Sequence, residues 1–600
     1  MSDIAFTLDS LRAAFDAGRT PLDVIEIALA RIEEANDPGI FIHLESPQAL
    51  RAAAAAIGQR NAGKPLWGVP FAVKDNIDVA GMPTTCACPA FAYVPDTDAP
   101  VVRALEQAGA ICVGKTNLDQ FASGLVGVRT PYPVPRNAVD ERLVPGGSSS
   151  GSAVAVKRGI VAFSLGTDTA GSGRVPAALN GIVGLKPSLG ALSTRGLVPA
   201  CRTLDCISIF ARSIADAEAV FSVTAAFDAA DPFSRAYDFA GSRAAIGTSR
   251  IGIPSAASIR FFGDEVQAEA FAETVSQLRA LGASVREVDF TPFYAAADLL
   301  YQGPWLAERL AGIAGFVDEH EDALHPVTRQ IIMGAKGMTA VDAFNGQYML
   351  QALKRQAEQA LAGIDLLCVP SIPGICTLAD IEADPFGPNA RLGTYTNFVN
   401  LLDMCGLTLP TGLRRDGLPA SITLLGRGGS DRRLASIGRE LTGDGHGKRI
   451  EGVQAGAPAT APIRLAVVGA HLSGMVLNHE LQMLGAKLVS KAATAAEYRL
   501  YVLPGSVPPK PGLLRVGPEK GASIALEIWS FPAEGFARFV SAIPTPLGVG
   551  TIRLDDGSSV QGFLVEALAV SDAPDITHFG GWRGYIASTT AEAPAANELK

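Results

Sequence analysis

Residues 145–176 read PGGSSSGSAVAVKRGIVAFSLGTDTAGSGRVP, and this stretch decides the fold. It contains two turns of small residues, at 146–152 and 166–173. Between them the pattern predicts a short helix over 153–158 and an apolar strand over 161–165. Glycines at this density serve a backbone that adopts positive φ or approaches a bound group closely. Serines among them can hold hydroxyls beside backbone N–H groups, which suits acyl transfer with an oxyanion hole.

A flexible linker and a phosphate-binding loop are the alternatives for this stretch. Apolar segments separate the two turns, whereas a Gly/Ser linker would lack them. Neither turn matches the GxxxxGKS/T pattern or a GxGxxG that follows a strand. Acyl transfer therefore remains the favoured interpretation.

Residues 146–152 and 166–176 resemble the signature of the amidase signature family, and GVPFAVKDN at 68–76 resembles its lysine motif. The resemblance implies an α/β fold in which helices cover a mixed sheet. It also implies three catalytic residues: a nucleophile, a bridging serine on a cis peptide bond, and a lysine, which are Ser172, Ser148 and Lys74.

The resemblance also assigns roles around these residues. Lysine is a base only when its pKa lies well below the usual value of about 10.4, and apolar neighbours on the predicted strand would lower it. Ser148 would relay the proton between Lys74 and Ser172 and later pass it to the leaving amine. The expected oxyanion donors are the backbone N–H groups of Thr169, Ala170, Gly171 and Ser172. Ala170 stands where many members have glycine, a change that keeps the backbone donor.

Two further segments resemble a narrower branch of the family, the allophanate hydrolases. These are FASGLVGVRTPYPVPRN at 121–137 and YQGPWLAER at 301–309. The resemblance places Gly124 against the substrate and makes Tyr301 and Arg309 substrate-binding residues. A guanidinium suits the carboxylate of allophanate because it can bind both carboxylate oxygens. Alternatively, Arg309 forms a surface ion pair with a nearby acid.

Arg129 and Tyr132, in the first of these segments, are expected to line the approach to the site. A purely structural role in the loop is the alternative for both residues.

The composition excludes several classes of protein. A net charge of −10 argues against nucleic acid or an anionic membrane as a partner. No apolar run is long enough to span a membrane, and the N-terminus lacks the features of a signal peptide. The eight cysteines show no zinc-binding spacing, so we expect reduced thiols and a cytoplasmic location. We expect no metal and no organic cofactor, because serine, lysine and backbone donors supply the chemistry.

The chain divides into a predicted amidase domain at 1–442, a Gly/Ala/Pro-rich linker at 443–462 and a smaller α+β domain at 463–600. The last domain resembles the C-terminal domain of allophanate hydrolases, which implies a gamma-glutamylcyclotransferase-like fold. It would promote breakdown of N-carboxycarbamate, with His471 as its catalytic residue and His479 in reserve. Two alternatives stay open: His471 only satisfies hydrogen bonds of its loop, or the whole domain is a dimerisation or docking module.

The resemblance predicts a hydrolase that cleaves allophanate to ammonia and N-carboxycarbamate, which then yields carbon dioxide and ammonia. It would be a homodimer with urea carboxylase as its functional partner. Two alternatives remain. One is a general or biuret-type amidase, and the other is the amidase-like subunit of a tRNA-dependent amidotransferase. The acidic charge balance and the extra domain argue against the second.

Overall fold

The structure, a computed structural model, describes residues 4–239, 244–444, 463–505 and 508–591. The chain forms two compact units, Met1–Ala455 and Gly456–Lys600. From residue 445 onward the predicted linker lies outside the described residues, so the predicted domain boundaries stay a prediction.

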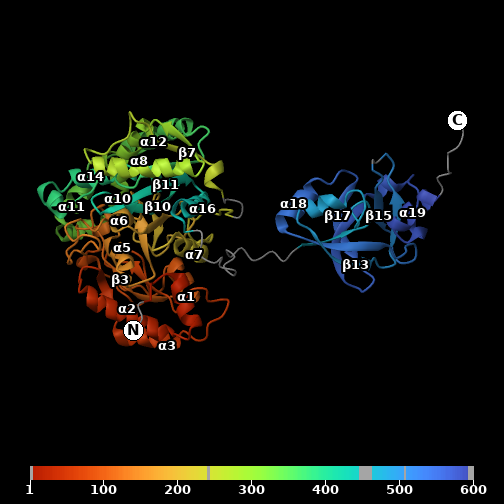
Figure 1. Cartoon of the computed structure of the whole chain (residues 1–600), viewed down its shortest axis with the longest axis horizontal. Helices are drawn as coiled ribbons and strands as arrows, with labels where there is room; N and C mark the ends of the chain where they lie inside the picture. The colour runs from red at the N-terminus through yellow and green to blue at the C-terminus, as the bar shows by residue number, and fades with distance from the viewer. Residues whose placement is uncertain (1–3, 240–243, 445–462, 506–507, 592–600) are drawn as a thin grey trace. The chain divides into compact units, whose positions relative to one another are not determined.

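The larger unit is built on a mixed sheet of eleven strands (Figure 1). Strand β2 pairs in parallel with β3 and β4, β7 pairs in parallel with β8 and β9, and the other neighbours are antiparallel. The sheet confirms the predicted α/β class. In sheet order the strands are β1 (Phe41–Leu44), β3 (Ile111–Thr116), β2 (Pro70–Lys74), β4 (Phe163–Asp168), β6 (Cys206–Ala211), β5 (Val183–Lys186), β10 (Met404–Leu413), β11 (Pro419–Arg427), β9 (Leu366–Pro370), β7 (Arg250–Pro254) and β8 (Ser284–Val288).

Helices surround this sheet (Figure 1), and the central strands β2, β4 and β6 are buried along their whole length. Strands covered on both faces have near-continuous apolar sequences, as β6 does with CISIFA. The helices are α1 (Leu8–Asp16), α2 (Pro21–Ala35), α3 (Pro47–Ala56), α4 (Pro100–Gln107), α5 (Ser150–Lys157), α6 (Val175–Asn180), α7 (Ile214–Thr224), α8 (Glu265–Ala280), α9 (Thr291–Gln302), α10 (Trp305–His320), α11 (Pro326–Met333), α12 (Ala340–Ala360), α13 (Leu378–Ala383), α14 (Gly387–Leu392), α15 (Asn397–Leu401) and α16 (Asp431–Thr442).

Parallel pairing of β2 with β4 brings the quoted stretch together with the lysine motif. Val73 of β2 lies opposite Leu165 of β4, so both strands end at the same edge of the sheet. Lys74 is the last residue of β2, and Asp168 is the last residue of β4. Ligand sites in such sheets form beyond the carboxyl ends of the strands, which is where this edge lies.

The smaller unit has its own core and two sheets. Its five-stranded sheet has the order β13-β16-β12-β18-β17, and β14 pairs with β15. Buried residues such as Leu465, Trp529 and Phe531 pack together in one cluster. The elements are β12 (Ile463–Val467), α17 (Asn478–Met483), β13 (Lys487–Ala493), β14 (Tyr498–Val502), β15 (Pro511–Arg515), β16 (Ala525–Phe531), α18 (Ala533–Ser541), β17 (Leu547–Arg553), β18 (Ser559–Val565) and α19 (Trp582–Ala591).

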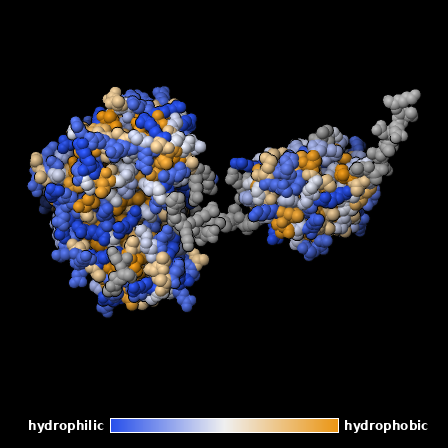
Figure 2. Space-filling view, viewed as in Figure 1, coloured by the Kyte–Doolittle hydropathy of each residue, from blue (hydrophilic) through white to orange (hydrophobic). Residues whose placement is uncertain are grey.

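The surface agrees with this burial of apolar side chains. On the face of the larger unit in Figure 2, hydrophilic residues predominate and hydrophobic residues occur in small groups between them. Among the helices of the described ranges, none combines the length and the apolar character that crossing a membrane requires.

Candidate active site

Lys74 ends β2 in a fully buried position. Burial removes water from the ammonium group and lowers the pKa of Lys74 to about 7, although Asp119, Asp168 and Asp205 oppose this shift. A lysine with such a pKa is neutral in a large fraction of molecules at neutral pH. It therefore has the property that a general base needs.

The Lys74 ammonium donates two hydrogen bonds of 2.7 Å, to Ser148 Oγ and to Thr167 Oγ1. The peptide bond between Gly147 and Ser148 is cis. The structure thus brings Lys74 and Ser148 together as the resemblance implies. Sequence reasoning missed Thr167, whose hydroxyl also accepts a bond of 3.3 Å from Asn76 Nδ2. Its place near the carboxyl end of the strand paired with β2 was the available signal.

Ser172 lies in the loop that follows β4 and is 3% exposed. Within the described part of the chain, its hydroxyl makes no hydrogen bond. The expected relay between Ser148 and Ser172 is therefore not a contact of this structure, and it stays a prediction. Among the described residues, the Ser172 hydroxyl therefore has no partner that would hold it away from a substrate.

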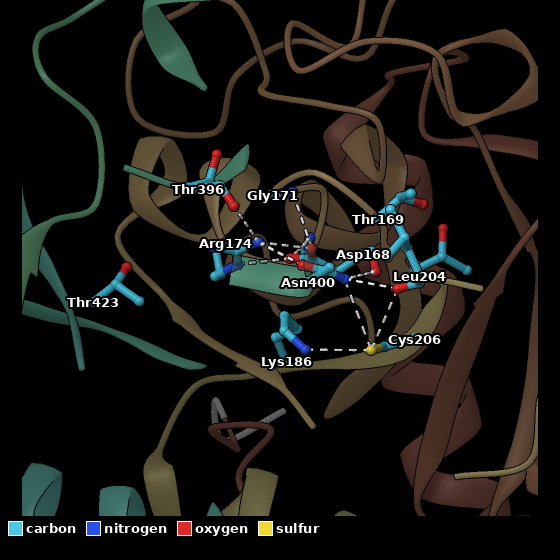
Figure 3. Close-up of polar contacts among 12 residues, drawn as sticks. Asp168, Thr169, Gly171, Arg174, Lys186, Leu204, Cys206, Thr396, Asn400 and Thr423 are labelled. Carbon is cyan, nitrogen blue, oxygen red and sulfur yellow. Dashed lines mark hydrogen bonds and ion pairs between the residues drawn. The ribbon is translucent and has the colours of Figure 1, made fainter. Parts of the chain in front are cut away.

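Asp168 holds the loop around Ser172, and Figure 3 shows its contacts with Gly171 and Arg174. Its carboxylate binds the Arg174 guanidinium through two contacts of 2.9 Å and accepts the N–H groups of Gly171 and Gly173, also at 2.9 Å. Asn400, on α15, donates to the Asp168 carbonyl at 2.8 Å and accepts from Arg174. All of these groups are buried, and their hydrogen bonds fix the loop, although Arg174 Nη1 has no hydrogen-bond partner among the described residues.

This clamp changes the set of expected oxyanion donors. The Gly171 N–H already donates a hydrogen bond to Asp168 Oδ1, so it is not free for a reacting carbonyl. The other three expected N–H groups find no acceptor among the residues that the structure describes: those of Thr169, Ala170 and Ser172. Three backbone donors beside Ser172 are thus available for an oxyanion.

Arg309, on α10, is 2% exposed and lies over the ring of Tyr301, with its guanidinium carbon 5.2 Å from the ring centroid. Its Nη1 lies 3.4 Å from Ser123 Oγ, and its Nε and Nη2 find no hydrogen-bond partner among the described residues. The surface ion pair is wrong for Arg309 because the side chain is buried. An unpaired buried guanidinium is costly unless an anion completes it.

Gly124 packs against protein atoms, since a Cβ at this position would lie 2.6 Å from Asp119 Oδ2. Arg129 is buried and bonds the carbonyls of Ser123 and Pro385, both at 2.9 Å. These contacts favour the structural alternative for Arg129, which holds the segment that carries Ser123. Sequence reasoning missed Ser123, because its contact with Arg309 joins parts of the chain far apart in sequence.

In the smaller unit, His471 Nε2 lies 3.0 Å from Glu480 Oε2, and the ring contacts Phe539 and Phe563. Burial lowers the pKa of His471, so the imidazole is neutral at pH 7. His479 is exposed and contacts the Val476 carbonyl at 3.0 Å. These contacts fit both a packing role and a catalytic role for His471.

The described residues contain no cluster that could hold a metal ion, and the cysteines are buried. Within the described ranges, no group of three or more His, Cys, Asp or Glu side chains is arranged to hold a metal ion. All eight cysteines are buried free thiols, and all lie in the larger unit: Cys86, Cys88, Cys112, Cys201, Cys206, Cys368, Cys376 and Cys405.

Known proteins match both units. Residues 23–435 match the family model "Amidase", and residues 463–587 match "Allophanate hydrolase C-terminal domain". Urea amidolyase of Saccharomyces cerevisiae is 43% identical over 545 residues, which is 87% of this chain and 30% of that protein. The chain thus spans less than a third of the length of the urea amidolyases that it matches.

Two other matches cover most of the protein compared. One of the subunits of glutamyl-tRNA(Gln) amidotransferase from Synechococcus elongatus is 33% identical over 68% of this chain and 91% of its own length. The solved Kluyveromyces lactis allophanate hydrolase is 39% identical with a TM-score of 0.71, over 97% of this chain and 99% of that chain. This chain therefore belongs to the amidase family and carries the C-terminal domain of allophanate hydrolases.

Proposed function

We propose that this protein is an allophanate hydrolase that uses Ser172, Ser148 and Lys74. The observation that carries the proposal is the Arg309 guanidinium, which is buried with two nitrogens unpaired in the larger unit that also carries the serine and lysine motifs. Allophanate has a carboxylate at one end and an amide at the other. The relatives named urea amidolyase and the solved allophanate hydrolase support this substrate.

In the proposed mechanism, neutral Lys74 takes a proton from Ser148 as Ser148 takes one from Ser172, and Ser172 Oγ attacks the ureido carbonyl of allophanate. The oxyanion is bound by the backbone N–H groups of Thr169, Ala170 and Ser172. The proton returns from Lys74 through Ser148 to the leaving nitrogen, and ammonia departs. Water then attacks the acyl-enzyme with Lys74 and Ser148 as base, which releases Ser172 and N-carboxycarbamate.

The substrate would be oriented by its carboxylate. The Arg309 Nε and Nη2 groups lie side by side on one edge of the guanidinium, and such an edge can bind both oxygens of a carboxylate. Tyr301 supports the guanidinium from its ring face. A neutral amide cannot use these donors as fully, so the pocket should prefer an anionic substrate.

For the smaller unit we propose a gamma-glutamylcyclotransferase-like fold that promotes decarboxylation of N-carboxycarbamate, with His471 as the reacting side chain. The neutral, half-enclosed imidazole supports a role in proton transfer. This step releases carbon dioxide and leaves carbamate, which breaks down to ammonia and a second carbon dioxide.

We further propose that the protein is cytoplasmic and homodimeric, with urea carboxylase as the partner that supplies allophanate. Buried free thiols support a reducing compartment. Helix α12 exposes Val341, Phe344 and Tyr348 at helical spacing, with exposed fractions of 66%, 61% and 68%, which supports self-association. Light scattering of the purified protein would measure the mass of the assembly.

The experiment that tests the activity offers allophanate, biuret, malonamide and an aryl amide in parallel and measures ammonia released. We expect allophanate to be strongly preferred. Equal turnover of all four would contradict the proposal and favour a general amidase. Ammonia transfer to glutamyl-tRNA, only with added partner proteins, would favour the amidotransferase alternative, which the match to amidotransferase chains keeps in view.

A further inference from the structure

Asp205 lies just before β6, and its carboxylate is almost completely buried, with 5% of the residue exposed. The carboxylate accepts a hydrogen bond from the Thr169 hydroxyl. It also accepts the backbone N–H groups of Ala200, at 2.9 Å, and Cys201, at 3.2 Å. The sequence gives no sign of this contact, because Thr169 and Asp205 are 36 residues apart.

Thr169 is the first residue of the loop that leads from β4 to Ser172. Its backbone N–H and that of Ala170 are two of the three proposed oxyanion donors. At the other end of the loop, Asp168 holds the N–H groups of Gly171 and Gly173. Two buried carboxylates therefore fix the loop. Asp168 binds the N–H groups of Gly171 and Gly173, and Asp205 binds the Thr169 side chain.

Asp205 also carries charge into the site. Arg309 and Lys74 are the cations that interact with it, and the thiols of Cys201 and Cys206 are the other titratable neighbours. Burial raises the pKa of both thiols, that of Cys206 to about 11, so both are neutral at pH 7. Burial raises the pKa of Asp205 to about 6, so this carboxyl is still mostly ionised at neutral pH.

We propose that Asp205 is a positioning residue of the amidase reaction, which holds the Thr169 side chain so that the Thr169 and Ala170 N–H groups are aimed at the reacting carbonyl, and which supplies a buried negative charge to the site. The inference rests on the proposed use of Ser172 and Lys74, but it does not depend on which amide is the substrate.

Three variants separate the hydrogen bond from the charge. Thr169→Val keeps the shape of the side chain and removes the hydroxyl, and Thr169→Ser keeps the hydroxyl. Asp205→Asn keeps the shape of the carboxyl group and removes its charge. Asp216→Asn is a matched control: Asp216 is 3% exposed, burial raises its pKa to about 6, and it bonds the Leu8 N–H instead of the loop.

The experiment measures kcat, KM and the pH profile of kcat/KM for whichever amide the wild-type protein hydrolyses. We expect Thr169→Val to lose roughly ten- to a hundredfold in kcat with little change in KM, and Thr169→Ser to retain most of the activity. In the pH profile, kcat/KM should rise as Lys74 loses its proton. We expect Asp205→Asn to move the midpoint of this rise to lower pH, because the charge that raises the Lys74 pKa is gone. Asp216→Asn should leave the midpoint unchanged.

Equal kcat for Thr169→Val and Thr169→Ser, or a midpoint that Asp205→Asn leaves unmoved, would overturn the inference. If Asp205→Asn does not fold, the two Thr169 variants decide it. Failure of the proposed function gives a different result: the wild-type protein would then lack activity toward allophanate while these variants still rank as stated on another amide.

Discussion

Ser172 is the residue on which the proposed chemistry depends most directly. The variant Ser172→Ala removes the hydroxyl of the proposed nucleophile. Asp168 and Arg174 hold the loop independently of that hydroxyl. We expect ammonia release to fall at least about a thousandfold while the circular dichroism spectrum and the melting temperature stay near those of the wild type. Substantial residual turnover would contradict the assignment of the nucleophile.

Lys74 makes the activity depend on pH with a defined sign. Its pKa is lowered to about 7, and the neutral form is the proposed base, so kcat/KM should rise as the pH rises through about 7. Below that pH the ammonium form predominates and cannot take a proton. Measuring kcat/KM at a series of pH values, with substrate concentrations below and above KM, would show this rise. Activity that stays constant from pH 5 to pH 8 would contradict a lysine base.

Arg309 should decide between anionic and neutral substrates. In Arg309→Met the buried chain is replaced by an apolar one and the donors for the carboxylate are lost, so kcat/KM for allophanate should fall about ten- to a hundredfold. Turnover of malonamide should fall much less. Arg415→Met, at a surface pair with Glu269, is the control. An equal loss for both substrates would mean that Arg309 only supports the fold.

At the scale of elements, α15 stabilises the loop after β4. Asn400 Nδ2 donates to the carbonyls of Asp168 and Leu204 at 2.8 and 2.9 Å, and all three groups are buried. We expect Asn400→Ala to lower the free energy of unfolding by about 2 kcal/mol, because it leaves buried acceptors unpaired. Urea denaturation would measure the change. Asn61→Ala, at an exposed position, should leave it unaltered within error.

The elements of the quoted stretch were predictable from sequence, but their ends were not. The helix predicted over 153–158 is α5, Ser150–Lys157, and the strand predicted over 161–165 is β4, Phe163–Asp168. Apolar residues mark the strand only as far as Leu165. It continues through polar residues to Asp168 because β6 pairs with it up to Cys206, and that neighbour is remote in sequence.

The candidate site was likewise predictable only in part. Lys74, Ser148, Ser172, Tyr301 and Arg309 were named because they occur in recognisable motifs. The partners that tune them, such as Thr167, Ser123 and Asp205, occur outside those motifs or have no chemical signature of their own. Only the folded chain brings their side chains into contact. The sequence also did not reveal that the Asp168 side chain takes the Gly171 N–H, although the two residues are only three positions apart.

At the scale of the whole molecule, the two compact units predict separable steps. A chain shortened to residues 1–444 keeps the entire larger sheet and should release the first ammonia at the wild-type rate. Carbon dioxide and the second ammonia should appear more slowly, because N-carboxycarbamate would then break down without the smaller unit. Time courses of both gases, with full-length His471→Asn for comparison, would measure this. Identical time courses would exclude a chemical role for the smaller unit.

The positions of the thiols allow the opening of the larger unit to be measured by chemical labelling. All eight cysteines are buried and lie in the larger unit, so a thiol reagent can react with the native protein only when that unit opens. The kinetics of labelling therefore follow the opening of the larger unit. The smaller unit has no cysteine and contributes no labelling. Mass spectrometry after brief labelling would give the opening free energy of each cysteine-bearing strand in the intact chain, without removing either unit.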